Sequence, residues 1–174
     1  VVLLSPGNPT GTMIEPVELA GIARLVEQHD LLVLSDEIYE KIVYDDARHV
    51  SIASLPGMRQ RTIVINGFSK SYSMTGWRLG YAAAPAEFMT SMVKVHQNLT
   101  TCAVSFAQAG GVAALEGPQD CVSDMVAEFK RRRDMLVEAL NRMPGLTCAM
   151  PQGAFYVFPN VRAFGLSSEE MALY

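Results

Sequence analysis

The sequence predicts an α/β fold, in which a mostly parallel sheet with flanking helices is followed by the start of a smaller α+β unit. Apolar runs at residues 1–4, 31–34 and 62–65 are continuous rather than alternating, which is typical of strands covered on both faces. A helical pattern joins the first two runs, and a strand–helix–strand unit of this length implies parallel pairing through a right-handed crossover. The run "LGYAAA" at 79–84 predicts a fourth strand.

The helix expected between the first two strands lies in "EPVELAGIARLVEQH". Pro16 suits its first turn, where the backbone N–H has no intrahelical partner in any case. One face carries the apolar residues Leu19, Ile22, Ala23 and Val26, while charged residues occupy the opposite face. The segment therefore predicts a helix that packs its apolar face on the sheet.

Helices are also expected at residues 86–101 and 104–116, where Glu116-Gly117-Pro118 is a strong stop signal. A long amphipathic helix is expected over 120–143. Its predicted core face consists of Val122, Met125, Val126, Phe129, Leu136, Leu140 and Met143. The basic run Lys130-Arg131-Arg132-Arg133 lies within this helix and is interpreted as a solvated face.

The last part of the chain predicts a separate, smaller unit. Residues 146–150 and 154–158 are expected to be strands, and "SSEEMALY" to begin a helix. The expected division is residues 1–118 for the α/β unit and residues 119–174 for the long helix and the start of the α+β unit. A chain that opens within a strand and lacks an initiator Met is expected to be a fragment of a longer protein.

Composition narrows the classes of partner. The chain has 174 residues, a formal net charge of −4 and a pI near 5.4, which argue against nucleic acid or an anionic membrane as its main partner. No apolar run approaches the roughly 18 residues of a membrane span. The sequence therefore predicts neither a nucleic-acid-binding nor a membrane protein.

The number and spacing of the cysteines and histidines bear on the cellular compartment and on metal binding. The three cysteines, Cys102, Cys121 and Cys148, are widely spaced and odd in number, as expected for free thiols in a reducing cytosol. The three histidines, His29, His49 and His96, have no metal-ligand spacing. We therefore expect a cytoplasmic protein without a metal site.

Polar side chains follow each of the first three predicted strands. Asn8 lies in "SPGNPTG", Asp36 and Tyr39 lie in "SDEIY", and Ser69 and Lys70 end "NGFSK". In parallel α/β sheets, ligands bind at the carboxyl ends of the strands. The sequence therefore predicts that these side chains meet at one edge of the sheet and form a site.

Each of these residues also has an ordinary structural interpretation. Asp36 could cap a turn, Asn8 before a proline is a common turn residue, and Tyr39 could pack with its hydroxyl at the rim. Lys70 could extend into solvent, and Arg78 could pair with any surface carboxylate. The combination favours a site more strongly than any one member does.

The chemistry of this set points to one cofactor. A lysine amine in a partly desolvated pocket can attack an aldehyde, and Ser69 with Arg78 offers a hydroxyl and a planar cation suited to a phosphate. Asp36 could hold a proton on a pyridine nitrogen, while asparagine and tyrosine side chains could donate to a phenolate oxygen. Aldehyde, phosphate, pyridine and phenolate together describe pyridoxal 5'-phosphate.

Four segments, "SPGNPTG", "SDEIYEKIVYD", "GFSKSYSMTGWRLGY" and "PQGAFYVFP", resemble the class I/II aminotransferases of fold type I. The bacterial-type aspartate and aromatic aminotransferases are the most similar in character, and the likeness runs in order over essentially the whole chain. The resemblance implies a pyridoxal-phosphate-dependent enzyme that transfers an amino group between an L-amino acid and a 2-oxoacid. It also implies that residues 1–118 are part of the cofactor-binding large domain.

The resemblance implies a role for each residue of the set. Lys70 would form a Schiff base with the cofactor and move the substrate Cα proton, and Asp36 would pair with the pyridine nitrogen. Asn8 and Tyr39 would hydrogen-bond the phenolate oxygen, and Asn8 would also lie near the substrate carboxylate.

Ser69 and Arg78 would hold the cofactor phosphate. The resemblance also implies a homodimer, an N-terminal half and a C-terminal carboxylate-binding Arg that have no counterpart in this sequence. We therefore expect the 174-residue chain alone to expose an apolar sheet edge and face, and to be inactive.

Other interpretations remain open. A carbon–sulfur lyase or an enzyme similar to aminocyclopropane-carboxylate synthase would use the same fold and cofactor. A non-catalytic domain could retain the fold alone, although the presence of Asp36, Lys70 and Arg78 together speaks against it. A nicotinamide-binding Rossmann domain lacks its GxGxxG signature after the first strand.

Overall fold

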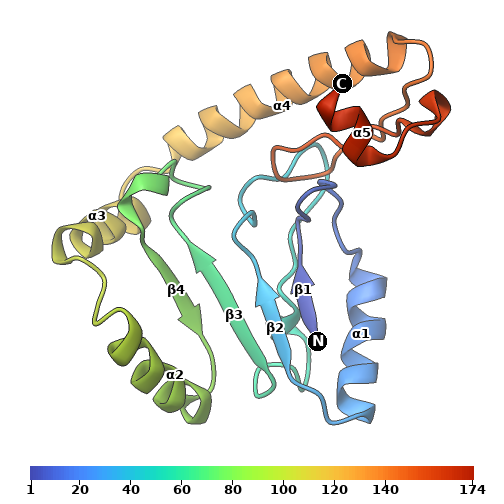
Figure 1. The fold of residues 1–174 in the computed structure, drawn as a ribbon. Helices are drawn as coiled ribbons and strands as arrows, with labels where there is room; N and C mark the ends of the chain where they lie inside the picture. Colours follow the sequence, from blue (N-terminus) through green and yellow to red (C-terminus); the bar gives the residue numbers. More distant parts are fainter.

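A four-stranded sheet forms the centre of the computed structural model, which describes all of residues 1–174 (Figure 1). Its strands are β1 (Val2–Leu4), β2 (Val33–Asp36), β3 (Thr62–Gly67) and β4 (Gly80–Ala83), in the order β1-β2-β3-β4. The first three strands are parallel and β4 is antiparallel to β3. The predicted mostly parallel α/β sheet is therefore confirmed.

The register brings the carboxyl ends of the three parallel strands to the same level. Leu4 lies opposite Asp36, and Asp36 lies opposite Ile65. The chain segments that follow these residues therefore leave the sheet at one edge, at the upper end of the strands in Figure 1.

Helix α1 (Pro16–Gln28) covers β1 and β2 as its apolar face predicts. Pro16 opens the helix, and the Glu15 backbone N–H donates to the Glu18 carboxylate at 2.8 Å. The buried residues Leu19, Ala23 and Val26 form one core cluster with Val33, Ile52 and Met58. Ile22 packs against the edge of this cluster and is half-buried.

Two helices follow β4, namely α2 (Ala86–Leu99) and α3 (Ser105–Glu116). Helix α3 approaches the chain around β3 and β4 so closely that a Cβ at Gly111 would lie 2.7 Å from Leu79 Cδ2 and 3.1 Å from Phe68 Cζ. Helix α2 buries none of its residues. Both helices end within two residues of the predicted positions.

Helix α4 (Asp120–Arg142) begins as predicted, but its core face is only partly right. Val122 is buried, and Met125, Val126 and Phe129 pack against the core cluster around Tyr39. Leu136 and Met143 are exposed, contrary to the prediction, and the next buried positions are Arg133 and Val137.

Arg133 explains part of this difference. Its guanidinium pairs with Asp45 at 2.8 Å, donates to the Pro151 carbonyl at 2.9 Å and lies 4.7 Å from the centre of the Tyr44 ring. These contacts direct the Arg133 face of α4 toward the 42–47 loop. The prediction that the whole basic run is solvated is therefore wrong for Arg133, and it holds for the exposed Arg131 and Arg132.

The strands predicted at 146–150 and 154–158 do not form. This segment makes only two isolated bridges, Val43 with Gly153 and Thr147 with Asn160. Its backbone groups bond to loops instead of a neighbouring strand, since Gly153 N–H donates to the Gly11 carbonyl and Ala154 N–H to the Ile42 carbonyl. A Cβ at Gly153 would lie 2.6 Å from the Pro6 ring, so glycine permits this close approach of two loops.

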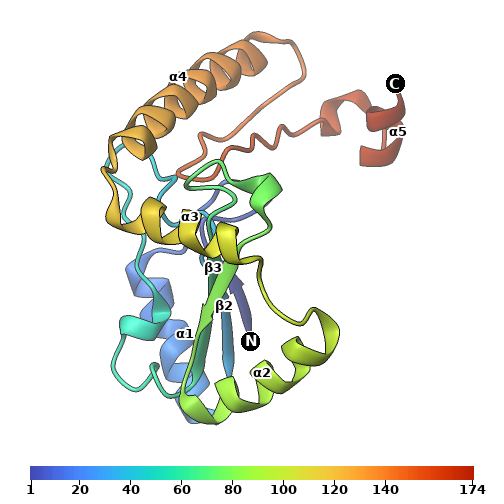
Figure 2. The ribbon, with the colours of Figure 1, turned by 90° about the vertical axis from the view of Figure 1, so that its left-hand side faces the viewer.

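The chain ends with α5 (Ser168–Leu173), whose start is the one predicted. The Ser167 hydroxyl caps it by accepting from the Glu170 N–H. In both ribbon views α5 lies apart from the sheet (Figure 2). Single turns of 3₁₀ helix occur at Ile52–Ser54, Thr75–Trp77 and Arg162–Phe164.

Apolar surface is exposed around the edge strands and α2, as predicted. Val2 on β1 is 73% exposed, Tyr81 on β4 is 44% exposed, and Leu99 at the end of α2 is 77% exposed. A hollow of about 390 Å³ lies between β3, β4 and α2, and its lining includes Ile65, Met92 and Val93. No helix combines the length and the apolar character needed to cross a membrane.

Candidate active site

Asp36 is the last residue of β2 and its carboxylate lies at the carboxyl edge of the sheet. One carboxylate oxygen accepts a hydrogen bond of 3.1 Å from the Ile38 N–H, which starts the turn after the strand. The second oxygen accepts no hydrogen bond from the chain. Asp36 therefore makes a turn and also keeps an oxygen that could accept a proton donor from a ligand.

Tyr39 follows on the same turn and is 3% exposed. Its hydroxyl lies 2.5 Å from the Tyr156 hydroxyl. Burial raises the pKa of Tyr39 most strongly, the Tyr156 hydroxyl and the Asp36 charge raise it further, and the nearby Asn8 side chain opposes them. Asn8, Asp36 and Tyr39 are thus brought together from the ends of β1 and β2, as predicted.

Lys70 lies in the turn after β3, half-buried, with its Nζ 6.0 Å from the centre of the Tyr39 ring. The same Nζ is 5.7 Å from the centre of the Phe155 ring. The ammonium group makes no hydrogen bond and no ion pair within the chain. A half-buried amine beside two aromatic rings, without a carboxylate partner, is available to react with a ligand.

Ser69 and Arg78 stand at the same end of the β3–β4 pair. Gly67 lies opposite Gly80 across the two strands, so each of the two residues is two positions beyond this pair. Arg78 is exposed in the left-handed conformation, with φ of 52°, and it donates to the Thr75 carbonyl at 2.8 Å. No hydrogen bond joins either side chain to Lys70.

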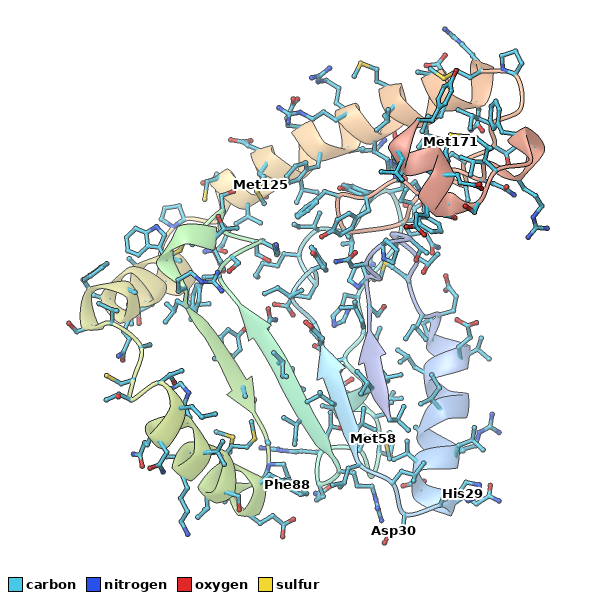
Figure 3. All side chains as sticks on the ribbon, in the orientation of Figure 1. His29, Asp30, Met58, Phe88, Met125 and Met171 are labelled. Carbon is cyan, nitrogen blue, oxygen red and sulfur yellow. The ribbon has the colours of Figure 1, made fainter.

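Two further residues reach this site from the segment after α4. Phe155 and Tyr156 contact Tyr39 edge to face, with ring centres at 5.4 Å and 5.7 Å. Figure 3 shows side chains from the strand ends and from this segment meeting below α4, where Met125 is labelled. Two signals in the sequence concerned this segment: its aromatic content suggested a strand, and "PQGAFYVFP" contributed to the family resemblance, but neither placed Phe155 or Tyr156 in the site.

A buried network lies directly behind Asp36. Glu37 is 3% exposed and accepts hydrogen bonds from Ser35 at 2.9 Å, Ser51 at 2.6 Å and His49 at 3.0 Å. Glu37, Glu40 and His49 have potential metal-ligand atoms within 4.8 Å of one another. The hydrogen bond from His49 accounts for the closeness of His49 and Glu37.

The donor groups at this end of the sheet fit pyridoxal 5'-phosphate. Lys70 supplies an unpaired amine, Asp36 an open carboxylate oxygen, and Tyr39 a hydroxyl with a raised pKa. Ser71 adds a buried hydroxyl that has no partner in the chain. The chain therefore carries, at this end of the sheet, the amine, acid and hydroxyl groups that an aldehyde, a ring nitrogen and anionic oxygens would need.

Fold and side-chain arrangement together define an α/β protein with a lysine-containing candidate site at the carboxyl ends of its parallel strands. The chain belongs to the aminotransferase class I and II family, whose sequence pattern matches residues 1–174. Members of this family depend on pyridoxal 5'-phosphate.

Individual relatives agree with this membership. The chain is 45% identical over 170 residues to an aspartate aminotransferase of Musicola paradisiaca, covering 98% of this chain and 42% of the relative. It is 45% identical over 174 residues to an aspartate aminotransferase of Pyrococcus abyssi, covering 99% and 44%. The solved aromatic aminotransferase of Pyrococcus horikoshii superimposes with a TM-score of 0.96 at 47% identity, covering 99% of this chain and 46% of that one. The chain thus spans less than half the length of these relatives.

Proposed function

We propose that the protein containing this chain is a pyridoxal-phosphate-dependent aminotransferase, which transfers an amino group between an L-amino acid and a 2-oxoacid. The observation that carries this proposal is the unpaired Lys70 amine beside Tyr39, at the strand ends where Asp36 and Asn8 also lie. Names of relatives support it, since those described above are aspartate and aromatic aminotransferases.

Each residue of the site would have a role that follows from the chemistry of its side chain. When bound, the cofactor supplies an aldehyde that captures amines and a pyridine ring that withdraws electron density from the substrate Cα. Lys70 would hold the cofactor by its amine and then carry the proton to and from the substrate Cα. Asp36 would keep the pyridine nitrogen protonated, since its free oxygen can accept that proton's hydrogen bond.

The other four residues would hold the ends of the cofactor. Asn8 and Tyr39 would donate to its phenolate oxygen, and Asn8 would also approach the substrate carboxylate. Ser69 and Arg78 would bind its phosphate, and Arg78 has N–H groups free for this because only its Nη1 donates to the Thr75 carbonyl.

The wider assignments follow from the same proposal. Residues 1–118 would belong to the cofactor-binding large domain, and residues 119–174 to the interdomain helix and the beginning of the small domain. We infer a homodimer, supported by the apolar surface around β4 and α2. The three free cysteines support a reducing, cytoplasmic compartment.

The test uses the intact protein that contains residues 1–174, loaded with pyridoxal 5'-phosphate. We expect a visible absorption band, trapping of the cofactor on Lys70 by borohydride, and exchange of amino groups between an aspartate or aromatic donor and a 2-oxoacid. Lys70→Ala should remove the trapped adduct and lower turnover by a factor of about 10² to 10⁴ or more. Lys94→Ala, on the exposed surface of α2, is the matched control. An unchanged band and adduct in Lys70→Ala would refute the proposal.

The alternative is a carbon–sulfur lyase or a similar enzyme on the same fold and cofactor. It would form the same Lys70 adduct, so the trapping experiment does not separate the two. Product analysis does, because a lyase releases pyruvate or ammonia from one amino acid, whereas an aminotransferase requires the 2-oxoacid as acceptor. A non-catalytic domain would do neither.

A further inference from the structure

The contact between Tyr39 and Tyr156 joins two parts of the chain that are 117 residues apart. The hydroxyl oxygens are 2.5 Å apart, and the rings meet edge to face at an interplanar angle of 81°. Tyr39 is buried on the turn after β2, and Tyr156 comes from the irregular segment after α4. The hydrogen bond therefore connects the site to the last third of the chain.

Each phenol carries one hydrogen, so only one of the two can donate in this pair. If Tyr39 donates to Tyr156, it has no hydrogen left for another acceptor. If Tyr156 donates, the Tyr39 hydrogen is free for an anionic oxygen in the site. The direction of this one bond thus decides whether Tyr39 is a donor or only an acceptor toward a ligand.

We propose that Tyr156 is a positioning residue, which donates to Tyr39 and so directs the Tyr39 hydrogen toward the phenolate oxygen of the cofactor. This inference rests on the proposed function, because it assumes that the cofactor binds beside Tyr39. Tyr156 acts through Tyr39 and not on the reacting atoms.

The relative strength of the two acceptors supports this direction, because an anionic phenolate oxygen accepts the Tyr39 hydrogen more strongly than the neutral Tyr156 hydroxyl does, which leaves Tyr156 to donate. Burial raises the pKa of Tyr39 most strongly and the Asp36 charge raises it further, so Tyr39 retains its hydrogen at neutral pH. Asp36 and Lys70 are the charged groups that the structure brings near Tyr39. An uncharged Tyr39 that is polarised by Tyr156 is a stronger donor than one without this partner.

Tyr156 is held firmly in place. The preceding Phe155 packs on Phe129 of α4 with ring centres 5.3 Å apart. The Ala154 N–H donates to the Ile42 carbonyl at 2.9 Å, and the Ala154 carbonyl accepts from the Tyr44 hydroxyl. The segment carrying Tyr156 is therefore attached to the loop that carries Tyr39, and both hydroxyls are fixed relative to each other.

The experiment is Tyr156→Phe in the intact, cofactor-loaded protein, followed by pH titration of the visible band. Donation to the phenolate disperses the negative charge that stabilises a protonated imine, so a weaker donor raises the pH midpoint of the band. We expect an upward shift of about half a pH unit and no more than about one unit, the range set by a single neutral hydrogen bond. Tyr39→Phe should shift the midpoint in the same direction and further.

Two further variants separate positioning from packing. In the Tyr39→Phe background, Tyr156→Phe should add no further shift, because Tyr156 acts only through the Tyr39 hydroxyl. Tyr72→Phe, which removes a hydroxyl bonded to Gln119 at 3.1 Å, is the matched control and should leave the midpoint unchanged. All these variants keep the aromatic ring, so loss of packing does not contribute.

The outcomes are distinguishable. The role of Tyr156 would be overturned by an unshifted midpoint in Tyr156→Phe. It would also be overturned if Tyr156→Phe shifted the midpoint equally in the unsubstituted protein and in the Tyr39→Phe background. Either result would leave the proposed function intact. Absence of any visible band or Lys70 adduct in the unsubstituted protein would instead overturn the proposed function itself.

Discussion

Lys70 shows how far single residues could be interpreted from the sequence. The position of the lysine after an apolar strand, with Asp36 and Asn8 after neighbouring strands, follows from strand order and from the rule that parallel strands end at one edge. The contact of Lys70 with Phe155 did not follow, because it joins residues 85 positions apart through packing of an irregular segment. Local patterns carry no information about such a contact.

The burial and hydrogen-bond partners of Glu37 could not be predicted from the sequence. Nothing in "SDEIYE" distinguishes the buried Glu37 from the half-buried Glu40. Its pKa is raised by burial, but the hydrogen bonds from His49, Ser51 and Ser35 outweigh burial and lower it overall. A carboxyl group with a lowered folded-state pKa stabilises the fold above its unfolded pKa, and that contribution is lost as the pH falls.

We therefore expect Glu37→Gln to lower the free energy of unfolding by about 1–3 kcal/mol at pH 7, because an amide nitrogen cannot accept the bonds that the carboxylate accepts. The difference from the unsubstituted protein should narrow as the pH falls below about 4.3, the usual glutamate value. Thermal unfolding at pH 7 and at stepwise lower pH measures this. Glu116→Gln, at the exposed end of α3, is the control, and a difference that stays constant with pH would contradict the assignment.

At the scale of elements, the strands and most helices were predictable because each is bounded by strong local signals. Four apolar runs, three of them continuous, indicated the four strands, and Gly117-Pro118 indicated the end of α3. The prediction of strands at 146–150 and 154–158 was wrong. Alternation and aromatic content indicate that a segment is half-buried, but they do not indicate whether it packs against a strand or a loop. Here the partners are the loops at Gly11 and Ile42, and no ladder forms.

The close contact between Gly153 and the Pro6 loop leads to a prediction about stability. A Cβ at this position would lie 2.6 Å from the Pro6 ring and 2.9 Å from the Ile42 carbonyl oxygen, and neither can move freely. Gly153→Ala should lower the free energy of unfolding by about 1–3 kcal/mol. Gly21→Ala on α1 meets nothing within 4 Å and should instead raise it by about 0.5–1 kcal/mol. Chemical denaturation of both variants measures the contrast, and equal effects would show that the loops can separate at no cost.

For the molecule as a whole, the exposed apolar surface was expected from the resemblance and is present in the structure. The continuous run of β1 implies a strand covered on both faces, yet Val2 is 73% exposed, and beside the sheet α2 buries none of its residues. The sequence could not indicate what covers this surface, since apolar periodicity is the same for any apolar partner.

We expect residues 1–174, expressed alone, to self-associate through this surface. Val95 and Leu99, 58% and 77% exposed, lie one helical turn apart on α2. Replacing both with Glu should reduce association without changing the helical content, as measured by sedimentation velocity and circular dichroism. A monomeric chain before substitution would contradict this expectation.

The long separation between Tyr39 and Tyr156 also sets an order of assembly on the ribosome. All four strands, with Asp36 and Lys70 at their ends, are synthesised before residue 156. At usual rates of synthesis, the turn that carries Lys70 precedes Tyr156 by on the order of ten seconds. The nascent sheet thus emerges with the Tyr39 hydroxyl unpaired, and the last aromatic residues to arrive complete the site.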